Sequence, residues 1–306
     1  MATKVPMLTI AGHDLLLDSG RLLRIGRIVG DTYVGIEDPK AIIQRLKECG
    51  TRVDLFTFTQ LLPDISTQFG YPVEWDNWAV IEVSTYEHWW TKQIDSKTRN
   101  MIRKAEKKGV VVREVPFDDL LVEGIWEVYN ECPVRQGKRN RHYGLDKATV
   151  RKLEATLLSN SIFLGAFFED KMVGFAKLVI DRNQRQVKMM NLLAMVEYRE
   201  KAPMNALVAE AVRSCAERGI PYCVYGSFTY GKKQNDSFTS FKSNNGFRPV
   251  LLPRYYVPLN SIGSLALKLG LQHRLRDRLP ESFASKLRFL RSKWYGKMLR
   301  SFRTAS

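Results

Sequence analysis

The amino-acid sequence predicts a mixed α/β protein. From Gly109 onward its periodic segments follow the order strand, helix, helix, three strands, helix, strand, helix, strand. The 306 residues are 44% hydrophobic and 26% charged, which is typical of a globular chain. This length predicts two domains, or one domain with a rudimentary partner.

The segments after residue 109 justify that order one by one. Asp146 is a suitable N-cap for the second helix, and Gly219 follows the third helix as a suitable C-cap. The turn 169–171 joins the first two strands of the central group. The expected elements are a strand at 109–115, helices at 117–132 and 146–158, strands at 161–168, 172–180 and 186–195, a helix at 202–218, a strand at 221–226, a helix at 235–246 and an extended segment at 247–259.

The first 108 residues hold fewer elements. Alternating apolar residues predict strands at 22–29, 52–58 and 78–83, and a helical pattern covers 39–48. This first part is therefore expected to be smaller and simpler than the second.

Positive charge dominates the chain and is unevenly spread. There are 48 basic and 32 acidic residues, a net charge of +16, and the segment 261–306 alone carries eleven basic residues against two acidic ones. A polyanion such as phospholipid, RNA or a sugar nucleotide is the natural partner of such a segment. A solvated helical surface is the competing interpretation for each basic residue taken singly.

Cysteine and histidine usage indicates no metal centre. The four cysteines, Cys49, Cys132, Cys215 and Cys223, form no CxxC pair, and no histidine lies near them at zinc-ligand spacing. The amino terminus lacks the pattern of a secretory signal, and the longest apolar run, 189–196, is too short to span a bilayer. We expect a cytoplasmic protein with reduced thiols and no metal.

The order of elements resembles the GNAT acyltransferase fold across residues 109–260, and "SFKSNNGF" resembles the last helix of that family and the turn after it. The resemblance implies a mixed-sheet α/β protein in which a complete GNAT-like domain at 109–260 follows a reduced GNAT-like half at 1–108. The basic segment 261–306 forms a third part.

The turn that binds the donor's pyrophosphate in GNAT proteins is altered here. The family motif uses small residues because they let backbone N–H groups approach the phosphates. In "YREKAPMNALV" Arg199 is in place, but Ala202 stands where the motif has glycine, and Met204 stands where it has glycine or alanine. Arg199 and Asn205 are the donor-binding candidates, and ordinary coenzyme A binding is expected to be weakened.

A second resemblance concerns the basic segment "SKTRNMIRKAEKKGVVV". Residues Lys97, Arg99, Asn100, Ile102, Lys104, Ala105, Gly109 and Val110 form a pattern similar to that of Fem-type aminoacyltransferases, which use aminoacyl-tRNA to build peptidoglycan bridges. Phe241-Lys242 matches a Phe-Lys pair of the same family, whereas the long helical arm of many members is missing. The loop "PVRQGKRNRHYG" is similar to that of GNAT-family proteins of bacterial envelope or exopolysaccharide synthesis.

These resemblances imply an N-acyltransferase with acyl-CoA or aminoacyl-tRNA as donor. The acceptor would be an amine of a phosphate-bearing envelope precursor or a sugar nucleotide. Two sets of residues are the candidates for binding it. One set lies on the helix that we expect to begin at Ser96, and the other lies in the polar loop 133–144: Lys97, Arg99, Arg103 and Lys104, and Arg135, Gln136, Arg139 and Tyr143. A solvated helix and a plain exposed loop are the competing interpretations.

Direct acyl transfer to an amine needs a proton route and a stabilised oxyanion. The catalytic candidates are His142 and Glu197 as bases, with Lys242 and Tyr230 as hydrogen-bond donors. Glu197 is equally explained as a charge at a strand end, and Tyr230 as a turn residue. A different class of function also fits the charge: a non-catalytic GNAT-like module that binds RNA or an anionic membrane.

The tail carries an apolar stripe. Phe283, Leu287, Leu290, Trp294 and Met298 recur at spacings of three and four after Pro280, with basic residues largely off the stripe. Such a helix fits an anionic membrane interface, which would place the protein peripherally at the inner face of the membrane. Packing of the same stripe against the core is the alternative.

Overall fold

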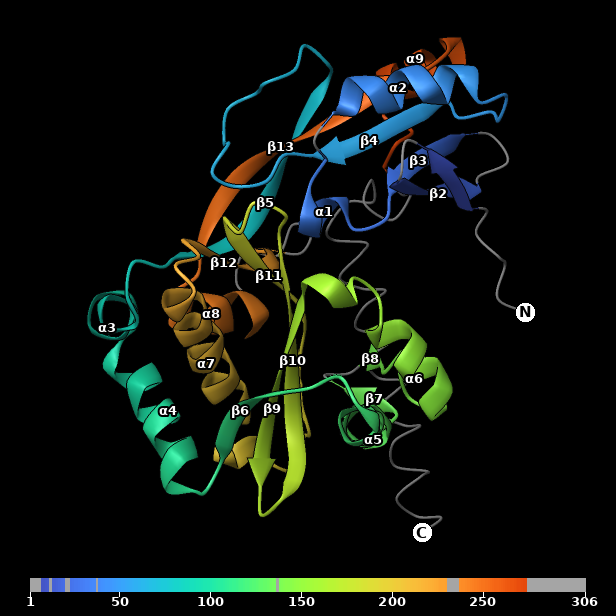
Figure 1. The fold of residues 1–306 in the computed structure, drawn as a ribbon. Coiled ribbons are helices and arrows are strands. Elements are labelled where there is room, and N and C mark those ends of the chain that lie inside the picture. The colour runs from blue at the N-terminus through green and yellow to red at the C-terminus, as the bar shows by residue number, and fades with distance from the viewer. Residues whose placement is uncertain are drawn as a thin grey trace.

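A computed structural model describes residues 7–10, 13–19, 23–36, 38–135, 138–229 and 237–273. Its main feature is one eleven-stranded sheet with the strand order β1-β2-β3-β4-β13-β5-β12-β11-β10-β9-β6. The predicted mixed α/β class is therefore confirmed, and both predicted halves share this sheet (Figure 1).

The first part of the sheet is built from short strands and two helices. Leu15, Phe56 and Phe58 form its core with Tyr255, under an amphipathic helix, α2. Its elements are β1 (Met7–Ile10), β2 (His13–Ser19), β3 (Arg24–Ile28), α1 (Asp31–Val34), α2 (Pro39–Glu48), β4 (Leu55–Thr59) and β5 (Val73–Glu82).

The second part begins with a helical segment and continues through the remaining strands. Its elements are α3 (Tyr86–His88), the π-helical turn η1 (Trp89–Gln93), α4 (Ser96–Lys107), β6 (Val111–Val115), α5 (Asp119–Asn130), β7 (Val134–Arg135), β8 (Lys138–Arg139), α6 (Lys147–Glu154), η2 (Leu158–Asn160), β9 (Ser161–Phe168), β10 (Lys171–Ile180), β11 (Gln186–Ala194), η3 (Arg199–Lys201), α7 (Pro203–Glu217), β12 (Tyr222–Ser227), α8 (Ser237–Asn244), β13 (Arg248–Pro258) and α9 (Ser261–Lys268).

Helices cover both faces of the second part. One face packs the apolar residues of β9 to β12 against α7 and α4, including Leu164, Met189 and Cys223. The opposite face packs Phe163 and Phe175 against α5 and Val150 of α6. Figure 1 shows α4 and α7 on one side of these strands and α5 and α6 on the other.

The two parts are joined through β13 and β5. The last strand, β13, pairs with β4 by Arg254↔Thr59 and with β5 by Arg254↔Glu74, both antiparallel. Its C-terminal end then leads into α9, where Ala266 packs on Ile25 and Leu55. The chain therefore returns from the second part to complete the first. The domain boundary at residue 108 stays a prediction.

Local sequence signals explain most of the helices. The Asp38 carboxylate accepts a hydrogen bond from the Ala41 backbone N–H, and Pro39 opens α2, so this helix spans the predicted 39–48. Asp118 and Asp146 cap α5 and α6 in the same way. The strands β9, β10 and β11 also lie within one residue of their expected ranges.

Other elements were not predicted from the sequence. The β1–β2 hairpin, α1, the π-helical turn η1 and the small β7–β8 ladder are too short to give a clear periodicity.

In the described part of the chain, no helix is both long and apolar enough to cross a membrane. The predicted stripe from Phe283 to Met298 lies outside the described residues.

Candidate active site at the splayed strands

The sheet opens between β11 and β12. These parallel strands pair only through Gln186↔Tyr222, Val187↔Cys223 and Lys188↔Val224, although β11 continues to Ala194. A bulge follows directly: on the β10 side Leu178 pairs with Met189 and Lys177 with Asn191, which leaves Met190 without a partner. Because a bulge bends its strand, it directs β11 away from β12. We call the region beyond Lys188, where β11 and β12 no longer pair, the opening.

Lys242 lies on the β12 side of this opening. Its side chain is fully buried in α8, its Nζ donates a hydrogen bond to the Ser227 carbonyl oxygen, and Nζ lies 4.9 Å from the centroid of the Tyr225 ring. Ser227 and Tyr225 belong to the part of β12 that does not pair with β11. A buried amine is thereby held where the two strands separate.

The turn after α8 is fixed by three other elements. The Asn245 side chain accepts from Asn205 Nδ2 at 3.1 Å, and its carbonyl oxygen accepts from Trp89 Nε1 at 3.1 Å. Thr98 Oγ1 donates to the Asn244 carbonyl oxygen at 2.9 Å. The segments that the sequence indicated separately, around Lys97, Asn205 and Lys242, therefore meet at one corner of the site.

The basic residues of α4 divide into two kinds. Arg99 Nη1 donates to the carbonyl oxygens of Ile94 at 2.7 Å and Trp90 at 3.0 Å, so this residue closes the turn before α4. Lys97 and Arg103 are exposed, and the Arg103 guanidinium lies 5.4 Å from the centroid of the Trp90 ring. Lys104 Nζ lies 3.7 Å from the Glu200 carboxylate.

A second buried amine lies at the vertex of the opening. Lys188 is the last residue of β11 that pairs with β12, and it faces away from α7 because its neighbours Val187 and Met189 pack toward that helix. Its Nζ lies 3.5 Å from the centroid of the Trp78 ring and donates to the Thr32 carbonyl oxygen at 3.1 Å. Burial lowers the pKa of Lys188 to about 7.

Charged residues of α1, β5 and β13 lie near this amine. Arg254 Nε binds the Asp76 carboxylate at 2.7 Å, and its Nη1 lies 3.9 Å from Asp31 Oδ2. Asp31 Oδ1 accepts from the Thr32 backbone N–H at 2.7 Å, whereas Oδ2 has no hydrogen-bond partner among the described residues. Burial raises the pKa of Asp31 and outweighs the lowering effect of Arg254.

The face of β11 that carries Lys188 also carries a polar network with α5 and α6. The Tyr129 hydroxyl donates to Glu154 Oε1 at 2.7 Å, and Asn191 Nδ2 donates to Glu154 Oε1 and Oε2 at 2.9 and 3.0 Å. Lys177 Nζ donates to the Glu154 carbonyl oxygen at 2.6 Å. Burial raises the pKa of the Glu154 carboxyl and is the largest influence on it.

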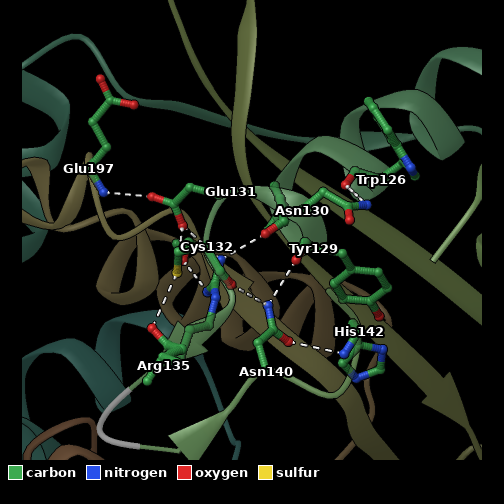
Figure 2. A network of polar contacts seen from close by, with 12 residues as sticks. Trp126, Tyr129, Asn130, Glu131, Cys132, Arg135, Asn140, His142 and Glu197 are labelled. Carbon is green, nitrogen blue, oxygen red and sulfur yellow. Dashed lines mark hydrogen bonds and ion pairs between the residues drawn. The ribbon is translucent and has the colours of Figure 1, made fainter. Parts of the chain in front are cut away.

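The polar loop 133–144 folds against the end of α5. Arg135 donates to the carbonyl oxygens of Val128 at 2.7 Å and Ala194 at 2.8 Å and to Glu131 Oε2 at 2.9 Å. Asn140 Nδ2 donates to the Tyr129 carbonyl oxygen at 2.8 Å, and Asn140 Oδ1 accepts from the His142 backbone N–H at 3.1 Å (Figure 2). The loop is therefore tied to α5 and to the end of β11.

His142 and Glu197 differ in their placement. The His142 ring stacks on Tyr129 with a centroid distance of 4.2 Å, and its Nε2 accepts from Arg141 Nε at 2.9 Å. Burial, followed by the positive charges of Arg141 and Arg135, lowers the pKa of His142 to about 4, so the ring is neutral near pH 7. Glu197 is exposed, and its side chain points away from this network (Figure 2).

The remaining site candidates lie apart from Lys242. Arg139, Tyr143 and Arg199 are exposed on β8, the polar loop and η3. Gln136 and Tyr230 lie outside the described residues. Ala202, which stands at a glycine position of the GNAT motif, has a left-handed φ of 55° at the start of α7. In the described ranges no group of three or more His, Cys, Asp or Glu residues is arranged to hold a metal ion.

Sequence reasoning missed several residues of the site. Lys177 and Lys188 are single charges within otherwise apolar strands, "GFAKLVI" and "QVKMMNLL", and that break in pattern was the available signal. Asp31, Glu154 and Arg254 gave no comparable signal, because their partners lie on distant segments.

The mixed sheet, the bulge in β11 and the separation of β11 from β12 agree with a GNAT-like fold of the Fem type. Solved structures agree with this assignment. No family model and no curated protein matches the sequence.

Three known structures are similar along most of the chain. They are the C-terminal domain (DUF2156) of a candidate lysylphosphatidylglycerol synthetase from Agrobacterium fabrum (TM-score 0.57, 13% identity, 86% of each chain covered), L-PGS from Bacillus licheniformis (TM-score 0.56, 12% identity, 86% of this chain and 87% of that chain) and FemX (TM-score 0.58, 9% identity, 86% and 89%). At these identities the likeness establishes the fold.

Proposed function

We propose that this protein is an acyltransferase that moves an acyl or aminoacyl group onto an amine of a phosphate-bearing cell-envelope component. The observation that carries the proposal is the fully buried Lys242 amine beside the unpaired part of β12. A buried amine is costly to maintain unless its charge or its hydrogen bonds are used. The name of one structural neighbour, a candidate lysylphosphatidylglycerol synthetase, supports a phosphate-bearing envelope acceptor.

The reaction would proceed by direct attack. The acceptor nitrogen forms a bond to the donor carbonyl carbon in the opening, and the negative charge collects on the carbonyl oxygen. The Lys242 ammonium would stabilise that oxygen by charge and hydrogen bonding. The bond to the ribose oxygen of tRNA, or to the sulfur of coenzyme A, then breaks, and this leaving group takes up the proton that the nitrogen loses.

The acceptor would be held by its phosphate. Exposed Lys97 and Arg103 lie on the helix whose first turn contacts the end of α8, so they can reach an anionic group near Lys242. His142, neutral near pH 7, fits a hydrogen-bonding role better than that of a strong base, because its low pKa makes it a poor proton acceptor. Arg135 is engaged by α5 and β11 and would position the loop.

Aminoacyl-tRNA is the preferred donor in this proposal. Ala202 replaces a glycine, and Met204 replaces a glycine or alanine, in the turn that cradles coenzyme A phosphates in GNAT proteins, and Pro203 provides no backbone N–H there. An acyl-CoA with a longer chain is the alternative donor. We place the reaction at the cytoplasmic face of the membrane.

A radiolabel assay tests the function. The full chain is incubated with a mixture of charged tRNAs or with acyl-CoA, and with phosphatidylethanolamine vesicles or a nucleotide-linked peptidoglycan precursor, both of which offer an amine. Lys242→Met keeps the length of the side chain and removes the charge, so turnover should fall by about 10²-fold or more. Lys47→Met, on the far helix α2, is the matched control and should leave turnover unchanged.

Two outcomes would contradict the proposal. If a folded Lys242→Met protein kept the wild-type turnover, Lys242 would not be the group that stabilises the oxyanion. No transfer with any donor, combined with RNA binding that Lys242→Met leaves intact, would instead support the non-catalytic module.

A further inference from the structure

The helix α9 exposes an apolar stripe. Ile262, Leu265 and Leu269 recur at spacings of three and four, and Leu271 follows them. Their exposed fractions are 44%, 57%, 59% and 45%. The opposite side of the same helix is buried, because Gly263 and Ala266 lie against the sheet. The helix therefore docks on the protein with its small residues and leaves its large ones outside.

The close contact on the inner side fixes this orientation. A Cβ at Gly263 would lie 1.9 Å from the Asp54 carbonyl oxygen, so only glycine permits the observed approach. The Asn260 side chain caps α9 by accepting from the Gly263 backbone N–H at 2.9 Å and also donates to Asp54 Oδ1 at 2.9 Å. A rotation that buried the leucines would break these contacts.

The sequence that follows the stripe is strongly basic. Lys268 is exposed on α9, and the chain from 274 to 306 adds ten Lys or Arg residues against Asp277 and Glu281. The sequence of that segment also holds the apolar series from Phe283 to Met298. In the sequence, the large aliphatic residues of α9 are thus followed directly by a dense set of cationic residues.

We infer that the exposed apolar stripe of α9 is a docking surface for an anionic lipid bilayer, to which the basic composition of the sequence after it is complementary. A bilayer presents both an apolar interior for the leucines and negative head groups for the cations. RNA would neutralise the cations but leave the leucines in water. A second copy of this chain carries the same net charge of +16 and would be repelled at this basic surface.

Vesicle binding by the full chain tests the surface. Vesicles of phosphatidylcholine with about one third phosphatidylglycerol should bind the protein at low salt, whereas pure phosphatidylcholine should bind it far less. The Leu265→Ser/Leu269→Ser variant should bind at least about tenfold more weakly, because two exposed leucines no longer enter the bilayer. Leu120→Ser on α5, whose side chain is 81% exposed, is the matched control and should bind like the wild type.

A charge variant and a gain-of-binding variant complete the test. Lys286→Gln/Arg288→Gln/Arg291→Gln should weaken binding by about a hundredfold at low salt. Leu265→Trp should strengthen it, because tryptophan favours the membrane interface, and this outcome does not depend on how well the serine variant folds.

Several results would overturn the inference. These are unchanged binding by the leucine variants, equal binding to neutral vesicles, or a solution dimer that Leu265→Ser/Leu269→Ser dissociates without affecting vesicle binding. None of the binding measurements uses acyl transfer. The inference can therefore fail while the proposed function stands, and the proposed function can fail while the inference stands.

Discussion

The Lys188 amine lies 3.5 Å from the centroid of the Trp78 ring, at the vertex where β11 and β12 separate. Trp78 belongs to β5, and the Thr32 carbonyl oxygen that accepts from Lys188 belongs to α1. A residue of the second part is thus held by two elements of the first. This contact makes the vertex of the opening part of the connection between the two predicted halves.

The first prediction concerns the pH dependence of stability. The pKa of Lys188 is lowered to about 7 in the folded protein, whereas an unfolded lysine titrates near its ordinary value of 10.5. Between these two values the unfolded state binds more protons, so the free energy of unfolding should rise with pH across this window. The burial of charge costs stability below about pH 7.

Lys188→Met should flatten this slope. Urea unfolding of both proteins at pH 6.5 and pH 9.5 measures this slope. Between these two pH values the free energy of unfolding should rise by up to a few kcal/mol more in the wild type than in the variant. Lys47→Met on the exposed side of α2 is the control and should keep the wild-type slope. Equal slopes in wild type and Lys188→Met would show that the amine is not titrating in this range.

The second prediction concerns the network below β11. Tyr129→Phe removes the hydroxyl that donates to Glu154 Oε1, and a buried carboxylate then loses a partner. We expect the free energy of unfolding to fall by about 1–3 kcal/mol, measured by chemical denaturation. Tyr143→Phe, on an exposed ring in the polar loop, is the matched control and should change stability by less than about 0.5 kcal/mol. A similar loss in both variants would argue against the network.

The third prediction concerns the donor. Because Ala202 replaces a glycine, Met204 replaces a glycine or alanine and Pro203 lacks an N–H group, calorimetry should detect weak or no binding of acetyl-CoA. Affinity should instead appear for longer acyl-CoA or for aminoacyl-tRNA. Micromolar acetyl-CoA binding that is lost on changing Arg199 would show that the altered turn still holds the phosphates.

Local patterns predicted the second part of the fold well and the site only in part. The cap Asp146 acts over three residues, so the start of α6 could be located from the sequence alone. Phe241-Lys242 was found because a short motif carries it. The partners of Lys188 and Glu154 could not be foreseen, because they come from segments up to 156 residues away whose pairing depends on the order of strands in the sheet.

The last prediction concerns the turn that positions Lys242. Gly246 has φ +90°, and a Cβ there would lie 2.9 Å from Trp89 Nε1. That nitrogen donates to the Asn245 carbonyl oxygen at 3.1 Å, so alanine at 246 would push apart the two groups that hold the end of α8. Gly144 is a matched control: its φ is +83°, but nothing lies within 4 Å of the added Cβ.

Both alanine variants should therefore lose about 1 kcal/mol from the left-handed backbone, and Gly246→Ala should lose at least about 1 kcal/mol more because of the close contact. Denaturation of the two proteins gives this difference. If Lys242 acts on the donor carbonyl, Gly246→Ala should also lower transfer by tenfold or more under conditions where the protein stays folded, since small displacements at a reacting centre are costly. Equal stability losses, or full activity in Gly246→Ala, would mean that the turn neither resists the added methyl group nor positions the lysine.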